Sequence, residues 1–137
     1  MQDFWADAEV IHRYTRAQAL ADGVLVEVPA GLAREAGLRW PVALTAAAWA
    51  DAVAWTAASE DAKPGATGQD EVGRLWDVLM MTRLAARHGG QQRRAVQVLR
   101  VPATGRGLRV RLTTLHLVAG PGDDGEPVLT LMMPGED

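Results

Sequence analysis

The sequence predicts an α+β protein in which a mainly antiparallel sheet of three or four strands packs on one long central helix, with smaller N-terminal helices. Residues 69–88 have the length and end signals of a single long helix. Residues 95–133 contain three segments of alternating apolar and polar residues, separated by glycine-rich turns. With 137 residues and 48% hydrophobic content, the chain is expected to form one domain over residues 1–137.

Shorter elements are expected before the long helix. Thr15 and Gln18 have the spacing of a capping box, and Thr45 is a good N-cap for a second helix. The expected elements are a helix from Thr15 to Asp22-Gly23, a strand at 24–28 that adds to the sheet edge, a short helix at 30–36, a brief strand at 42–44 and a helix at 46–55. Residues 56–68 are small and polar and are predicted to form a mobile loop.

The long helix carries an arginine within its apolar face. Asp70 and Glu71 in the first turn and Arg87 and His88 in the last turn suit the helix dipole. At 100° per residue, the main apolar face contains Val72, Leu75, Trp76, Leu79 and Ala86. Arg83 lies at the centre of this face. The ordinary interpretation is an arginine that extends to solvent or is paired internally, and the alternative is an arginine presented inside a cleft.

The three strands are predicted at 95–101, 108–118 and 127–133. If Val101 lies opposite Leu108, one face of the first hairpin carries Leu99, Val101, Leu108, Val110 and Leu112, and the other carries Arg100, Arg109 and Arg111. The apolar phase then reverses at Leu115 and Leu117. We expect a β-bulge near Thr113 and Thr114 to cause this reversal.

Charge is distributed unevenly along the chain. Between Val78 and Gly122 there are eight arginines and no acidic residue, whereas the rest of the chain holds all 17 acidic and only six basic residues. Arg100, Arg106, Arg109 and Arg111 are therefore the candidate residues for binding an anion or an acidic partner. A second hairpin that pairs Val118 with Pro127 would bring Glu136 and Asp137 beside Arg109 and Arg111. The chain end is then expected to neutralise part of this arginine face.

The sequence offers little for catalysis, metals or cofactors. There is no cysteine, Ser59 is the only serine, and His12, His88 and His116 are far apart, so no cofactor or metal site is expected. Asp123 and Asp124 suit a hairpin turn better than a calcium loop. A candidate cleft could be lined by His12, Tyr14, Arg16 and Arg83. Without a signal peptide or a long apolar run, a cytoplasmic location with no membrane partner is expected.

Several blocks resemble a domain-of-unknown-function family whose members occur on bacterial plasmids, integrated elements and phages. The blocks are Tyr14-Thr-Arg-Ala-Gln-Ala-Leu-Ala-Asp-Gly-Val-Leu-Val-Glu-Val28, Pro41-Val-Ala-Leu-Thr45, Gln69-Asp-Glu-Val-Gly-Arg-Leu-Trp-Asp-Val-Leu79, Leu99-Arg-Val-Pro102, Gly120-Pro-Gly-Asp-Asp-Gly-Glu-Pro127 and Pro134-Gly-Glu-Asp137. Together they extend over nearly the whole chain from Tyr14 onward. The resemblance implies an accessory protein of mobile DNA, and it carries no assigned active site.

These observations favour a non-enzymatic binding protein of a mobile element, which would act by occupying a host or plasmid protein. An inhibitor of a host defence system, such as an anti-CRISPR-like protein, is one form of this function. The first alternative is a nucleic-acid-binding accessory factor that uses the arginine face, although the net charge of −3 and the lack of aromatic residues there disfavour it. The second is a small enzyme that acts on a nucleotide-like substrate in the candidate cleft. The oligomeric state is left open.

Overall fold

The computed structural model describes residues 14–87 and 92–136. In chain order, its elements are α2 (Arg16–Ala21), β1 (Leu25–Glu27), α3 (Ala30–Glu35), β2 (Val42–Thr45), α4 (Ala46–Ala52), α5 (Ala57–Asp61), α6 (Glu71–Arg87), β3 (Arg93–Arg100), β4 (Arg111–Pro121) and β5 (Pro127–Met132). The predicted helix starts at Thr15 and Thr45 are confirmed, because each side chain accepts a hydrogen bond from the backbone N–H three residues later. None of the described helices has the length and apolar character needed to cross a membrane.

The five strands form one mixed sheet in the order β1-β2-β5-β4-β3. β2 and β5 run parallel, and every other neighbouring pair is antiparallel. The predicted α+β class is confirmed, and β1 is an edge strand as expected. The expectation of three or four mainly antiparallel strands is wrong in detail, because the short, largely buried segment of β2 takes an interior place between β1 and β5.

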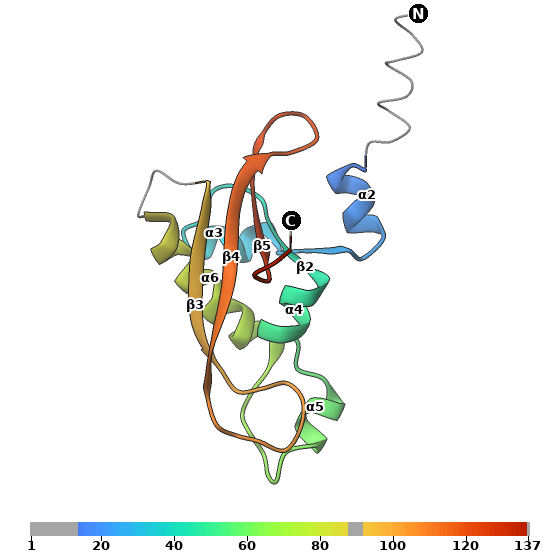
Figure 1. The fold of residues 1–137 in the computed structure, drawn as a ribbon, viewed down its shortest axis with the longest axis vertical. Coiled ribbons are helices and arrows are strands. Elements are labelled where there is room, and N and C mark those ends of the chain that lie inside the picture. Colours follow the sequence, from blue (N-terminus) through green and yellow to red (C-terminus); the bar gives the residue numbers. More distant parts are fainter. Residues whose placement is uncertain (1–13, 88–91, 137) are drawn as a thin grey trace, which may run out of the picture.

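Helix α6 lies behind β3 and β4 in Figure 1 and covers one face of the sheet. Leu75, Val78 and Leu79 of α6 pack into the core with Val96 and Leu115 of the sheet. On the opposite face, the Arg16 guanidinium of α2 donates to the Thr130 hydroxyl at 2.7 Å. That opposite face is therefore covered over β5, and its β3–β4 half is left open.

The buried face of α6 differs from the predicted one. Its buried residues are Arg74, Leu75, Val78, Leu79 and Thr82, whereas Val72 is 68% exposed. Asp70 caps the helix, since its Oδ1 accepts a hydrogen bond from the Gly73 N–H at 2.7 Å. The middle of the helix is apolar nearly all round, so periodicity alone could not select the side that packs. His88 lies outside the described residues.

Residues 56–68 contain regular structure where a loop without it was expected. Thr56 and Ser59 form a capping box at the start of α5. Lys63 is 7% exposed, and its ammonium group donates to the Gly107 carbonyl at 2.6 Å. This bond ties the segment to the connection between β3 and β4, which lies beside α5 in Figure 1.

The two hairpins have registers that differ from the expected ones. β3 and β4 pair without interruption from Arg93↔Val118 to Arg100↔Arg111, so the bulge predicted near Thr113 and Thr114 is absent. β4 and β5 pair Val118 with Thr130, not with Pro127, and the hairpin closes at Pro121↔Pro127. The pairing of β5 with β4 is thus shifted by three residues from the prediction. Because three is an odd number, the β5 residues predicted on one face of the sheet lie on the other.

Candidate functional site

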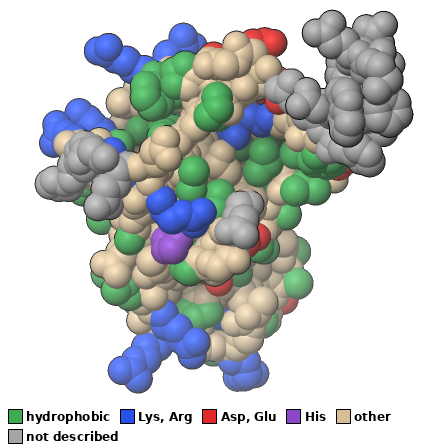
Figure 2. Space-filling view, turned by 45° about the horizontal axis from the view of Figure 1, so that its top comes forward, with side chains coloured by type: hydrophobic (Ala, Val, Ile, Leu, Met, Phe, Trp, Pro, Cys, Tyr) green, Lys and Arg blue, Asp and Glu red, His purple; other side chains and the backbone are tan. Residues whose placement is uncertain are grey.

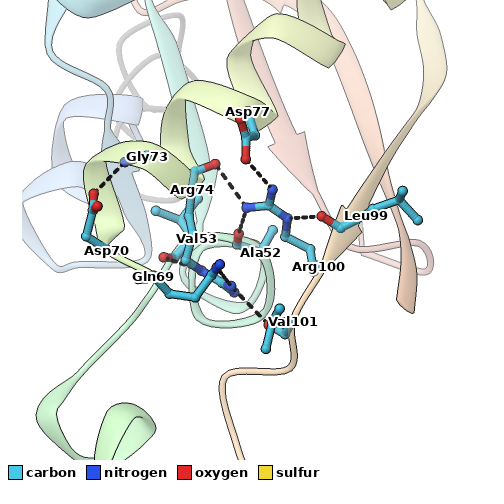
Figure 3. Close-up of polar contacts among 10 residues, drawn as sticks. All are labelled: Ala52, Val53, Gln69, Asp70, Gly73, Arg74, Asp77, Leu99, Arg100 and Val101. Atoms are coloured by element: carbon cyan, nitrogen blue, oxygen red, sulfur yellow. Dashed lines mark hydrogen bonds and ion pairs between the residues drawn. The ribbon is translucent and has the colours of Figure 1, made fainter. Parts of the chain in front are cut away.

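Arg100 is buried, which contradicts its prediction as a surface arginine. Its side chain is 7% exposed, and its Nη2 forms an ion pair with Asp77 of α6 at 2.8 Å. Its Nη1 donates to the carbonyl oxygens of Ala52 and Arg74, each at 3.2 Å. Figure 3 shows Arg100 reaching from β3 to α4 and α6. Arg100 therefore joins three elements and is unavailable to a partner.

A second arginine, which the sequence did not single out, lies beside Arg100. Arg74 is 2% exposed and donates to the carbonyl oxygens of Val53 and Val101, each at 3.0 Å (Figure 3). Its guanidinium also lies 5.0 Å from the centre of the Trp55 ring. Burial, followed by the charge of Arg100, lowers the pKa of Arg74 to about 10. Arg74 thus stays cationic at neutral pH and has a structural role.

The apolar face of the β3–β4 hairpin is exposed instead of buried. Val96 and Val98 point toward α6, so the residues that alternate with them point to the open face. Leu99 and Leu112 are paired directly across the two strands and are 62% and 58% exposed. Leu108 and Val110, in the connection that leads into β4, are 48% and 50% exposed. Such a group of exposed aliphatic residues marks a candidate interaction surface.

Three predicted arginines lie at the same end of the β3–β4 hairpin. Arg106, Arg109 and Arg111 are all exposed, and within the described residues no ion pair to them is found. Basic side chains project from the lower end of the molecule in Figure 2, the end at which the β3–β4 connection lies in Figure 1. Arg111 is paired with Arg100 and therefore points to the opposite face of the hairpin from Leu112. We call Leu99, Leu108, Val110 and Leu112, together with Arg106 and Arg109 of the connection, the apolar–basic surface.

The predicted neutralisation of this surface by Glu136 is wrong. The Glu136 carboxylate accepts hydrogen bonds from the Thr45 hydroxyl at 2.7 Å and from the Met133 N–H at 2.8 Å. It is therefore held beside β2, with two strands between it and β3. Asp137 lies outside the described residues. Glu136 therefore does not neutralise the arginines of the apolar–basic surface and does not compete there with an acidic partner.

A groove of about 500 Å³ continues from this surface around the edge of β3. One wall is formed by Asp77, Met80 and Met81 of α6, and Leu112 of β4 lies on the opposite side. Between these walls, the groove is lined by residues 97–100 of β3, including Leu99. The groove is mostly apolar, and the one carboxylate among these lining residues, that of Asp77, is paired with Arg100.

The structure does not bring the predicted cleft residues together. Arg16 donates to Thr130 and to the Leu129 carbonyl, and burial lowers the pKa of Arg16. The exposed Tyr14 donates to Asp22 at 2.6 Å, and this bond is the main cause of its raised pKa. Arg83 packs against Gly37, where an added Cβ would lie 2.8 Å from the Arg83 Nε. His12 lies outside the described residues.

A second pocket, of about 390 Å³, lies near the C-terminal end of α6. It is lined by Gly37, Leu38, Arg39, Trp40, Ala86, Gln92, Arg94, Leu117, Ala119 and Leu129. Among these lining residues there is no carboxylate, hydroxyl or imidazole group to serve as a general acid or base. Arg94 donates to the Ala85 and Ala86 carbonyl oxygens, so part of its guanidinium caps α6.

The residues considered for other chemistry have structural contacts. The Asp123 carboxylate accepts hydrogen bonds from the N–H groups of Arg16 and Ala17, at the start of α2. Ser59 is 6% exposed and belongs to the capping box of α5. In the described part of the chain, no group of three or more histidine or acidic residues is arranged to hold a metal ion.

Comparison with known proteins gives a family but no function. No curated protein and no solved structure matches the chain. The model of DUF6573, a family of unknown function, matches residues 1–137. Because this match extends over the whole chain, the chain belongs to the DUF6573 family.

Proposed function

We propose that this chain is a non-enzymatic binding protein that engages an acidic partner protein through the apolar–basic surface. One observation carries the proposal: the cross-strand pair Leu99 and Leu112 is exposed on an open sheet face, at the end of the hairpin where Arg106 and Arg109 are also exposed. Covering a leucine side chain contributes roughly 1.5–3 kcal/mol. A micromolar affinity corresponds to about 8 kcal/mol of binding free energy. A partner that covers both leucines would therefore gain a substantial part of it.

The charge of this surface specifies the partner. Arg106 and Arg109 lie in the part of the chain that has no acidic residue between Val78 and Gly122. Basic groups around an apolar centre accelerate association with an acidic protein and disfavour basic ones. We therefore expect an acidic protein surface that presents apolar residues at its centre.

The proposed setting comes from the sequence blocks that resemble proteins of plasmids, integrated elements and phages. An accessory protein of such an element would act on a host or plasmid protein by occupying it. Inhibition of a host defence system, as by an anti-CRISPR-like protein, is one such action. The buried roles of Arg74 and Arg100 support a binding protein over an enzyme, because they remove two cations from the groups available for catalysis.

Site-specific photocrosslinking in the native host tests the proposal. A photoreactive amino acid replaces Leu112 in one variant and Val24 in a control, since Val24 is 51% exposed beside β1, at the opposite edge of the sheet. We expect an adduct at position 112 that protease destroys and nuclease leaves intact, and no such adduct at position 24. Equal labelling at both positions, or no adduct at position 112, would contradict the proposal.

Nucleic-acid binding is the second candidate, and the exposure of Arg106, Arg109 and Arg111 favours it. It predicts binding to mixed DNA or RNA that weakens steeply as salt rises and is lost in a triple Arg106→Ala/Arg109→Ala/Arg111→Ala variant. Arg100 is left intact in this variant, because its removal would disturb the core. An absence of binding at low salt would eliminate this candidate.

A further inference from the structure

We propose that the outer edge of β3 is a strand-addition site for an extended, acidic segment of the partner protein. This inference rests on the proposed function, because it specifies how the partner is held. β3 has eight residues, and among the described strands it is the last in the sheet order, next to β4. An edge strand of this length offers a row of backbone groups to an added strand.

The hydrogen bonds of the hairpin show which backbone groups face outward. The Ala119 N–H donates to the Gln92 carbonyl at 2.9 Å, and these two residues continue the β3–β4 register. Because bonded and non-bonded pairs alternate in an antiparallel ladder, the even-numbered residues of β3 bond β4. The N–H and C=O groups of Ala95 and Gln97 therefore point away from the sheet. The Leu99 carbonyl also points outward and already accepts a bond from the Arg100 Nε.

The groove at this edge fits the two faces of an added strand. Met80 and Met81 of α6 line it on the covered side of the sheet, and Leu99 and Leu112 line it on the open side. Side chains of a strand point alternately to the two sides. An added strand would thus place one set of side chains against the methionines and the other set over the leucine pair.

Charge favours an acidic segment of another protein over a second copy of this chain. β3 contains Arg93, Arg94 and Arg100 and no acidic residue. Arg100 is paired with Asp77 and Arg94 donates to carbonyl oxygens of α6, so Arg93 is the exposed cation of β3. A second β3 offers Arg93 no acidic residue, whereas a strand with an acidic residue at that end would complement it. Arg93 is exposed at the start of β3, and its guanidinium contacts the His116 ring at 3.2 Å (Figure 2 shows the histidine beside a basic side chain).

The test uses a library of random decapeptides displayed on phage and selected on the full-length chain. Selected peptides are then measured against Ala95→Pro, which removes an outward N–H, and against Ala95→Val, which keeps it. We expect extended peptides with apolar residues on both sides and at least one acidic residue, which bind Ala95→Pro about tenfold more weakly and bind Ala95→Val with little change. Gln97→Pro is the second variant, because it removes the next outward N–H.

The following results would overturn strand addition. Failure to select peptides, selection of peptides without acidic residues, or wild-type affinity for both proline variants would do so. Unfolding of both variants would show that these N–H groups bond β4. Self-association of the chain in sedimentation experiments, abolished by Ala95→Pro, would assign the edge to a second copy. Peptides that need Leu99 and Leu112 but ignore both proline changes would overturn strand addition alone, and the proposed function would stand.

Discussion

Arg100 shows how a residue in an alternating strand can be misjudged from sequence. It follows Val96 and Val98 in the inward phase of β3, so its side chain enters the protein, where backbone carbonyls of α4 and α6 accept its hydrogen bonds. A surface role was predicted from its charge and its likeness to Arg109 and Arg111. Which arginine of a set finds buried acceptors depends on α4 and α6, and these are distant in the sequence.

Replacement of Arg100 tests this structural role. Arg100→Met should reduce the free energy of unfolding by about 2–4 kcal/mol, because the buried carbonyl oxygens of Ala52 and Arg74 lose their donor. Asp77→Asn should cost less than about 1 kcal/mol, since the Asp77 side chain is 58% exposed and the pair is screened by solvent. Urea unfolding of both variants measures the difference, and equal losses would contradict this assignment.

Glu60 gives a pH-dependent test at the same scale. Its carboxylate accepts bonds from the Thr67 hydroxyl and N–H and from the Trp55 Nε1, and these bonds lower the pKa of Glu60 below its ordinary value of 4.5. A lowered acid pKa stabilises the fold above pH 4.5, and the contribution is lost as the pH falls through the folded-state value. Glu60→Gln should therefore melt below wild type at about pH 7, and the gap should shrink at about pH 3. A gap that is independent of pH would contradict this role.

At the scale of elements, the sequence predicted that the β3–β4 hairpin forms, but it did not predict which face of the hairpin is buried. The alternation of Leu99, Val101, Leu108, Val110 and Leu112 was visible in the sequence, and so was its conflict with Leu115 and Leu117. A bulge was invoked because it would keep both sets in the core. The structure has a continuous register and leaves Leu99, Leu108, Val110 and Leu112 of the first set exposed. Apolar alternation shows that residues share a face, and packing partners decide which face is covered.

Two leucines of β4 provide a matched test of this orientation. Leu115→Ala should cost about 2–5 kcal/mol, because Leu115 is fully buried. Leu112→Ala should change the free energy of unfolding by no more than about 0.5 kcal/mol, because Leu112 is 58% exposed. Chemical denaturation of the two variants compares them directly. A large loss for Leu112→Ala would mean that the apolar face is buried.

At the scale of the whole molecule, the α+β class and most helix starts could be predicted, but the sheet order could not. Capping residues such as Thr15 and Thr45 are local signals, whereas the insertion of β2 beside β5 joins segments more than 80 residues apart. The same limit applies to the candidate site. Arg106 and Arg109 were found from charge, while the exposed leucines became visible only through the register of the hairpin.

The most direct measurement is the affinity of the crosslinked partner for two matched variants. Leu99→Thr/Leu112→Thr removes apolar area from the apolar–basic surface, and Val24→Thr makes the same kind of change beside the opposite sheet edge. We predict at least about a tenfold loss for the double variant, equivalent to about 1.4 kcal/mol, and wild-type affinity for Val24→Thr. Unchanged binding by the double variant, or equal losses in both, would contradict a binding role for this surface.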